Sequence, residues 1–151
     1  MSSPDALPPE VARLLLDVVA DGFVLYCCGR RADPAALVAS YEWPGHVDLV
    51  TIRDFDLITA ARVPKPDSGA VDVFAPDTAV WAYQGPAQAA LRALLELVHP
   101  LHADAPDVRF PAPYSLHIAR HEQRPMTIRL PTPGRAGTRA TRLAAVLSPV
   151  G

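Results

Sequence analysis

Histidines are the residues of this sequence whose type and spacing are best suited to chemistry. His117 and His121 lie four residues apart in the stretch SLHIARHE, and His99 and His102 lie just upstream. A zinc ion needs ligands that converge on one point at about 2.0–2.1 Å. On a helix, two residues at this spacing lie about 5–6 Å apart and can share a metal ion. On a strand they lie about 13 Å apart and cannot.

The pattern around the downstream pair favours a strand. Tyr114, Leu116 and Ile118 alternate with Ser115 and His117. Alternation with a period of two is typical of a strand with one buried face. We therefore expect no metal ion at this pair, although a helical segment would restore the metal hypothesis.

A second candidate site pairs His46 with Asp48. These residues lie two apart at the start of an expected strand, so their side chains point to the same face. A histidine beside a carboxylate is the minimum for general-base catalysis. Together with His117 they define an alternative function, a small hydrolase or metal-dependent enzyme. Because neither a nucleophile nor a pocket is identified beside them, we interpret them as part of a solvated strand face.

Motifs of common cofactor and hydrolytic sites are absent from the sequence. The eight glycines are scattered, and none begins the phosphate-binding patterns G-x-x-x-x-G-K or G-x-G-x-x-G. The nucleophile turn G-x-S-x-G and the zinc motif H-E-x-x-H are also missing. We therefore expect no cofactor, and the sequence favours a protein that is not an enzyme.

Two aromatic residues, Tyr41 and Trp43, stand in the turn-like stretch YEWPGH. An exposed aromatic side chain on a turn can anchor a protein partner, which makes both residues candidates for partner binding. The alternative is that both belong to the core or cap it.

The C-terminal region is the most distinctive part of the chain. Residues 1–122 hold all 16 acidic residues and nine of the 14 basic ones, whereas residues 123–151 hold five arginines and no acid. In a helix, Arg135, Arg139 and Arg142 form one stripe beside an apolar face. We expect this helix to dock by its apolar side and to present its arginines to solvent or to an anionic partner.

Length and composition are those of one globular domain over residues 1–151, with 50% hydrophobic and 20% charged residues. Residues 131–151 are a possible basic helix or tail docked on an acidic body. Cys27 and Cys28 are adjacent and cannot link distant segments, which fits a reducing compartment. The N-terminus lacks the pattern of a signal peptide, and no stretch is apolar enough to span a bilayer. We therefore expect a soluble, cytoplasmic protein without membrane association.

The elements that position these residues follow from hydrophobic periodicity and turn residues. Helices are expected at 8–21, 34–40, about 86–98 and 138–147. Strands are expected at 23–29, 46–53, 56–63, 71–74, 78–83, 114–120 and 126–130, with Asp54 and Asp56 in a turn. The fold class is therefore α+β, with a mainly antiparallel sheet made of a meander and a C-terminal strand pair. The N-terminal helix and the helix at about 86–98 pack on this sheet.

A small α+β domain without catalytic motifs, and with opposite charges on its body and tail, favours a non-enzymatic binding or adaptor protein. Its partner is expected to be a protein or a second copy of the chain. The candidate contact residues are Tyr41, Trp43, Arg135, Arg139 and Arg142. Nucleic-acid binding through the arginine-rich C-terminus is a further alternative. The acidic body and the lack of interleaved aromatic and basic residues argue against it.

Overall fold

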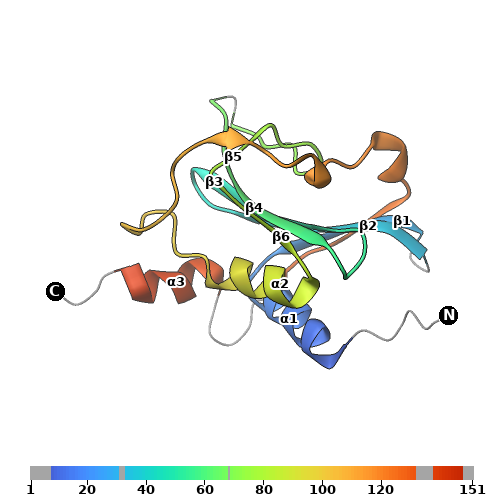
Figure 1. Cartoon of the computed structure of the whole chain (residues 1–151), viewed down its shortest axis with the longest axis horizontal. Coiled ribbons are helices and arrows are strands. Elements are labelled where there is room, and N and C mark those ends of the chain that lie inside the picture. The colour runs from blue at the N-terminus through green and yellow to red at the C-terminus, as the bar shows by residue number, and fades with distance from the viewer. Residues whose placement is uncertain (1–7, 31–32, 68, 132–137, 148–151) are drawn as a thin grey trace.

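The computed structural model of the chain describes residues 8–30, 33–67, 69–131 and 138–147. These residues form helices on one side of a largely antiparallel sheet and loops with short helical turns on the other (Figure 1). The α+β class predicted from the sequence is confirmed. The α-helices of the described residues are α1 (Pro9–Ala20), α2 (Ala87–Glu96) and α3 (Arg139–Leu147).

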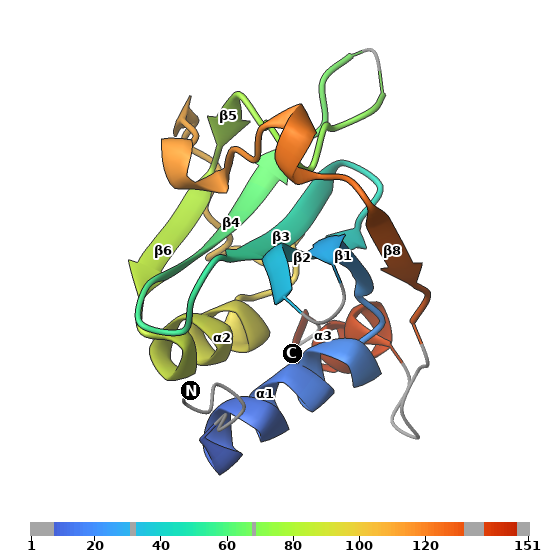
Figure 2. The same cartoon turned by 90° about the vertical axis from the view of Figure 1, so that its right-hand side faces the viewer.

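The main sheet has six strands in the order β6-β4-β3-β2-β1-β8, and all neighbours are antiparallel (Figure 2). A separate two-stranded sheet pairs β5 with β7. The strand bounds are β1 (Val24–Arg30), β2 (Asp33–Glu42), β3 (His46–Ile52), β4 (Ile58–Pro64), β5 (Thr78–Ala79), β6 (Trp81–Gly85), β7 (Phe110–Pro111) and β8 (Met126–Arg129).

One face of the main sheet, which we call the helix face, is covered by α1 and α2. Because α1 carries apolar residues at helical spacing, it buries Val11, Leu14 and Val18 against the sheet. Helix α2 does the same with Ala90, Leu91 and Leu94, which are 0% exposed. Strands β2, β3 and β4 supply the facing side chains, and together these residues form the largest apolar cluster of the core.

The opposite face, which we call the loop face, is covered by segments with little regular structure. The 3₁₀ turns η1 (Tyr114–Leu116) and η2 (Arg120–Glu122) lie over it. Leu116 packs on β3 and β4, and Ile118 packs near Cys28 and Val38. The guanidinium of Arg53 fastens this segment by donating to both carboxylate oxygens of Glu122, each at 3.2 Å, and to His117 O at 2.9 Å.

The prediction of a strand at residues 114–120 is wrong, although the pattern that suggested it is present. Leu116 and Ile118 are both buried, so the apolar alternation is real. However, Leu116 N–H donates to Pro113 O and Ile118 N–H to Phe74 O, so the backbone forms a turn and one isolated contact rather than a ladder. The expected C-terminal strand pair therefore does not form, and β8 pairs with β1 instead.

Three further local expectations are also corrected. The segment expected as a helix at 34–40 belongs to β2, because pairing on both sides places it inside the sheet. Residues 71–74 form a turn, in which Phe74 N–H donates to the Asp72 carboxylate, instead of a strand. The single strand expected at 78–83 is divided into β5 and β6 at Val80. The turn expected at Asp54 is confirmed, since its carboxylate accepts from the N–H groups of Asp56 and Leu57.

Candidate functional site

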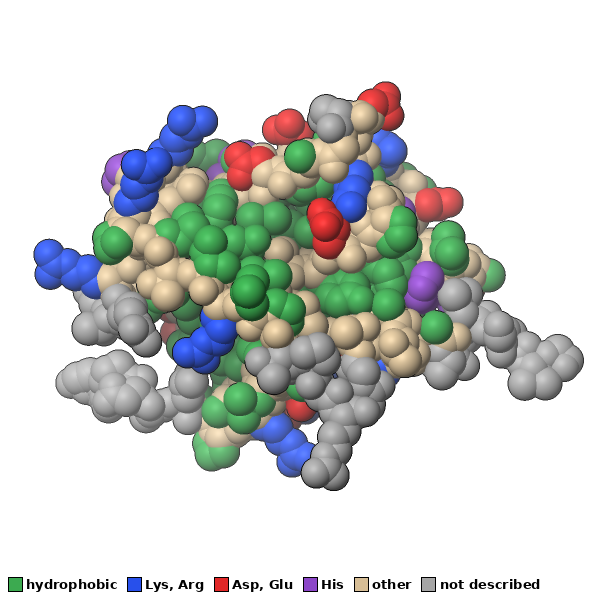
Figure 3. Space-filling model, turned by 180° about the vertical axis from the view of Figure 1, so that it is seen from behind, with side chains coloured by type: hydrophobic (Ala, Val, Ile, Leu, Met, Phe, Trp, Pro, Cys, Tyr) green, Lys and Arg blue, Asp and Glu red, His purple; other side chains and the backbone are tan. Residues whose placement is uncertain are grey.

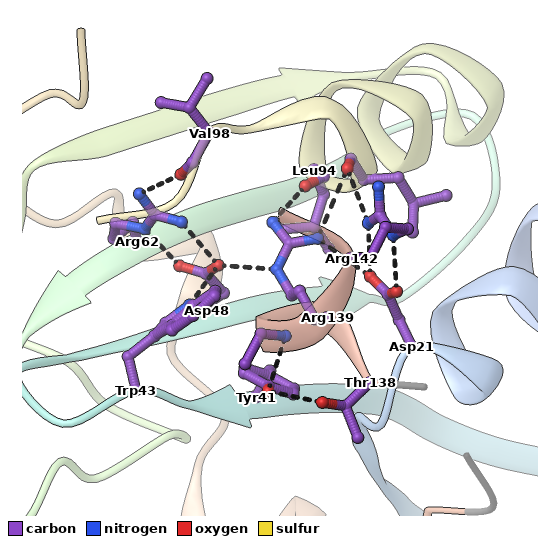
Figure 4. A network of polar contacts seen from close by, with 12 residues as sticks. Asp21, Tyr41, Trp43, Asp48, Arg62, Leu94, Val98, Thr138, Arg139 and Arg142 are labelled. Carbon is purple, nitrogen blue, oxygen red and sulfur yellow. Dashed lines mark hydrogen bonds and ion pairs between the residues drawn. The ribbon is translucent and has the colours of Figure 1, made fainter. Parts of the chain in front are cut away.

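A buried network of charged side chains lies where α3 meets the sheet (Figure 4). Its centre is the carboxylate of Asp48 on β3, which is 0% exposed. The guanidinium of Arg62 on β4 donates to Asp48 through Nε at 2.6 Å and NH2 at 2.9 Å. Arg139 Nε donates to Asp48 at 3.0 Å, and so does Trp43 Nε1 at 2.9 Å. Both carboxylate oxygens are therefore fully engaged.

The network continues to Asp21, which follows α1. Arg139 NH1 donates to Asp21 at 3.1 Å, and Arg142 donates to both Asp21 oxygens at 2.9 and 2.7 Å. Arg139 NH2 also donates to Leu94 O at 2.6 Å, and its guanidinium lies 5.5 Å from the ring centroid of Phe23. The pKa of Arg142 is raised, chiefly because its side chain is hydrogen-bonded to the Asp21 carboxylate.

The docking of α3 differs from the expected arrangement at Arg139, whereas Arg142 is exposed as expected. We expected the helix to present its arginines outward, yet Arg139 is 0% exposed and anchors the helix to the body. Leu143 is buried beside it, so the apolar face also contributes. A buried charge is tolerated only when it is paired and hydrogen-bonded, and Arg139 meets both conditions. Arg135 lies outside the described residues.

The two aromatic candidates serve the same network. Trp43 is 3% exposed, and its ring lies 4.7 Å from that of His99, centroid to centroid. Tyr41 is half-buried, and its hydroxyl accepts from Ala140 N–H at 3.0 Å at the start of α3. Both side chains thus lie where the alternative interpretation, as residues that belong to or cap the core, places them.

The catalytic candidates do not form a dyad. His46 and Asp48 project from the same strand, but no hydrogen bond joins them, and the Asp48 carboxylate is occupied by Arg62, Arg139 and Trp43. Burial lowers the pKa of His46, and the positive charge of Arg62 lowers it further, against a smaller opposing effect of Asp48. The neutral ring is therefore favoured by its surroundings rather than by an acid–base partner.

His117 is engaged elsewhere, on the loop face. Its Nε2 lies 3.0 Å from Pro76 O, and its ring lies 4.8 Å from that of Tyr114, centroid to centroid. His121 is exposed on η2. Within the part of the chain that the structure describes, no three His, Cys, Asp or Glu side chains are grouped so as to hold a metal ion.

The feature that the sequence reasoning missed is the open edge at β8. Thr127, Ile128, Arg129 and Leu130 are all exposed, with Ile128 at 54% and Leu130 at 71%. No other described strand pairs with the outer side of β8, which ends the order of the main sheet. A sheet edge of this kind presents unpaired N–H and C=O groups to any further strand.

A shallow hollow of about 390 Å³ lies on the loop face over β1 and β2, and β1 is the neighbour of β8 in the sheet. It is lined by Val24 and Tyr26 of β1, by the end of β2 and by Val71 and Val73 of the covering loop. Ile128 is paired with Tyr26 across the ladder and therefore lies on the same face as this lining. Figure 3 looks at the side of the molecule that carries β8, and apolar side chains gather over the middle of it.

The register between β8 and β1 determines which backbone N–H and C=O groups of β8 face the open edge. Gly29 N–H donates to Pro125 O at 2.8 Å, which identifies this residue pair as a hydrogen-bonded one. Because such pairs alternate along an antiparallel ladder, Thr127 and Arg129 also turn their N–H and C=O groups toward β1. Met126 and Ile128, and Leu130 if the strand is continued, turn theirs toward the open edge.

The opposite edge of the sheet, β6, is less accessible. Helix α2 packs on β6 from the helix face. On the loop face, Gln84 Nε2 donates to Ser115 Oγ at 2.6 Å, which ties β6 to η1. Of the two edges of the main sheet, β8 is therefore the better suited to a further strand.

Comparisons with known proteins give no further guidance. No protein-family model matches the chain, no curated protein matches it, and no solved structure matches it. Among the described residues, no helix has both the length and the apolar character needed to cross a membrane.

Proposed function

We propose that this chain is a non-enzymatic binding protein that accepts an extended segment of a protein partner along the outer edge of β8. The observation that carries the proposal is the exposure of Thr127–Leu130 on the edge strand, next to a hollow of mixed polar and apolar lining over β1 and β2. Addition of a strand to a sheet edge is a common way to bind a peptide: main-chain hydrogen bonds give affinity, and neighbouring pockets read alternate side chains.

The state of the polar side chains supports a binding role over a catalytic one. Asp48, Arg62 and Arg139 are 0% exposed, and both arginines are bonded to Asp48. Arg139 holds α3 against the body, and the carboxylates of Asp48 and Asp21 together balance the charges of Arg62 and Arg139. The side chains that remain exposed at β8 are instead an isoleucine, a leucine, a threonine and an arginine. These suit recognition of an extended chain by shape and apolar contact.

We place this function in the cytoplasm. Cys27 and Cys28 are both free thiols, and Cys28 is buried, with its pKa raised by burial and by the neighbouring Cys27. Free, buried thiols of this kind fit a reducing compartment.

A selection from a library of short random peptides tests the binding role. The library is selected on the wild-type chain alone, and the enriched peptides are then tested on Ile128→Pro, which removes an outward N–H but no hydrogen bond to β1. We expect the enriched peptides to be extended and to alternate in polarity, to bind the wild type and to fail on Ile128→Pro. They should still bind Tyr114→Ser, which removes an aromatic side chain that is 83% exposed elsewhere on the surface. Peptides that bind Ile128→Pro equally well would contradict the proposal.

A further inference from the structure

The outer edge of β8 is complementary to a second copy of itself. The residues of β8 that turn outward are Met126 and Ile128, and Leu130 directly follows the strand. Two identical strands that pair antiparallel are related by a twofold axis, so an edge strand can pair with the same strand of a second copy and form a closed dimer. We infer that the partner at this edge is a second copy of this chain, paired antiparallel through Ile128. The inference rests on the proposed function.

The register follows from which groups face outward. With Ile128 opposite Ile128 of the second copy, Met126 lies opposite Leu130 of that copy, and the reverse pair completes the set. Met126 and Ile128 turn N–H and C=O groups outward by the alternation fixed at Gly29 and Pro125, and the pairing we propose extends the strand by one residue to Leu130. Every outward group along this stretch then meets a complementary group.

The prolines that flank β8 do not interrupt this pairing. Pro125 occupies a position whose backbone groups turn toward β1 and away from the open edge, since its carbonyl accepts from Gly29 N–H. Pro131 lies two residues beyond the end of β8. A proline on an edge strand blocks a further strand only where its missing N–H faces outward. The N-terminal end of the pairing segment is therefore compatible with a partner strand, and Pro131 falls outside the paired residues.

Charge also favours this register. Arg129 is the only charged side chain of Met126–Leu130, and a charged residue on an edge usually opposes pairing. Here it falls opposite Thr127 of the second copy rather than opposite its own equivalent, so like charges are not placed directly across from each other. Thr127 and Arg129 share the helix face, and the apolar residues share the loop face.

Pairing in this register lines up the apolar side chains of both copies on the loop face. Met126 already packs against the buried cluster that contains Cys28 and Val38, whereas Ile128 and Leu130 are more than half exposed. Pairing places Ile128 beside its equivalent and Leu130 beside Met126 of the second copy, which removes these side chains from water. The sheet then continues from one copy into the other, and each copy contributes one hollow, at its Val24 and Tyr26, to the same face.

Sedimentation equilibrium of the purified full chain tests the dimer. We expect a mass that rises with concentration from 16.2 kDa toward twice that value. Ile128→Pro and Ile128→Lys should both remain at the mass of one chain, while Tyr114→Ser should behave as the wild type. Far-UV circular dichroism of each variant shows whether its fold is retained, and Ile128→Lys keeps the test valid if the proline variant unfolds.

Disulfide trapping tests the register. Under mild oxidation, Ile128→Cys should form a symmetric dimer, because the Cα atoms of a hydrogen-bonded pair lie about 5.5 Å apart, within disulfide range. Thr127→Cys is the matched control, since its equivalent lies two positions away in this register. Mass mapping separates these products from links through Cys27. Equal trapping of both variants would overturn the register.

The outcomes separate this inference from the proposed function. A chain that stays at 16.2 kDa at every concentration overturns the dimer, and selected peptides that still depend on Ile128 then leave the binding role standing. A dimer that survives both Ile128 variants uses another surface and also overturns the inference. Absence of both self-association and Ile128-dependent peptides overturns both proposals together.

Discussion

Arg139 Nε donates a hydrogen bond to Asp48 Oδ2 at 3.0 Å, although the two residues lie 91 positions apart in the chain and neither is exposed. This contact joins the last helix to the middle of the sheet. Because the same guanidinium also bonds Asp21 and Leu94 O, one side chain links α3 with β3 and with the ends of α1 and α2.

Replacement of Arg139 by methionine should therefore destabilise the chain severely. Loss of one partner leaves the carboxylates of Asp48 and Asp21 short of a buried positive charge, which typically costs about 3–5 kcal/mol. Urea unfolding followed by circular dichroism measures the change. Arg120→Met, at an exposed arginine on η2, is the control and should change the free energy of unfolding by at most about 0.5 kcal/mol. A cost of under about 1 kcal/mol for Arg139→Met would show that the network contributes little.

The cavity left by Arg139→Ala should accept free guanidinium. The vacated site retains the two carboxylates, the carbonyl of Leu94 and the ring of Phe23, all of which contact the native guanidinium. We expect millimolar guanidinium chloride to raise the melting temperature of this variant, since a ligand that binds only the folded state stabilises it. Sodium chloride at equal concentration is the control. A rise of the same size in the wild type would argue against site binding.

Gly29 should tolerate no side chain. Its φ is +96°, and a Cβ atom there would lie 2.8 Å from the backbone nitrogen of Ala35, at the irregularity between β1 and β2. We expect Gly29→Ala to lower the free energy of unfolding by about 1–3 kcal/mol, the usual range for strained backbone. Gly45→Ala is the matched control because no atom lies within 4 Å of its added Cβ. Equal effects of the two substitutions would contradict this interpretation of Gly29.

Stability should fall as the pH drops below neutrality. The pKa values of His46 and His99 are lowered from 6.5, first by burial and then by the charge of Arg62. The unfolded chain therefore takes up protons on these rings at a higher pH than the folded chain does. The free energy contributed by the neutral rings is complete above the unfolded value and is lost as pH falls through the interval down to the folded values.

Urea unfolding between about pH 5 and pH 8 measures this dependence. We expect His46→Gln to flatten the profile below pH 6.5, the ordinary histidine value. His121→Gln, which removes an exposed imidazole, is the control for the substitution itself. A stability that rises on acidification through this range would have the wrong sign.

The helices and most strands were predictable because their signals are local. Helix α1 shows apolar residues at helical spacing, and the strand at β3 is an apolar run closed by turn residues. The prediction of a strand around Leu116 and Ile118 failed because burial of alternate residues produces the same sequence pattern with or without a pairing strand. Periodicity reports which side chains are buried, not where the backbone hydrogen bonds go.

The candidate site was less predictable because it depends on contacts between distant segments. The sequence makes Asp48 a candidate for catalysis and Arg139 a candidate for partner binding. Nothing in their spacing predicts that the two side chains form an ion pair. The strand at Met126–Arg129 was expected, whereas its edge position depends on its pairing with β1, more than 90 residues upstream. The sequence alone does not predict that Ile128 is exposed, because its exposure depends on the pairing of β8 with β1.

Residue-resolved amide hydrogen exchange at β8 tests the central claim, that this edge accepts another strand, most directly. In dilute solution Thr127 should exchange slowly, because its N–H faces β1, and Ile128 should exchange fast, because its N–H faces outward. Raising the protein concentration, or adding a selected peptide, should slow the exchange of Ile128 while that of Thr127 changes little. An Ile128 amide that stays fast under both conditions would contradict the account.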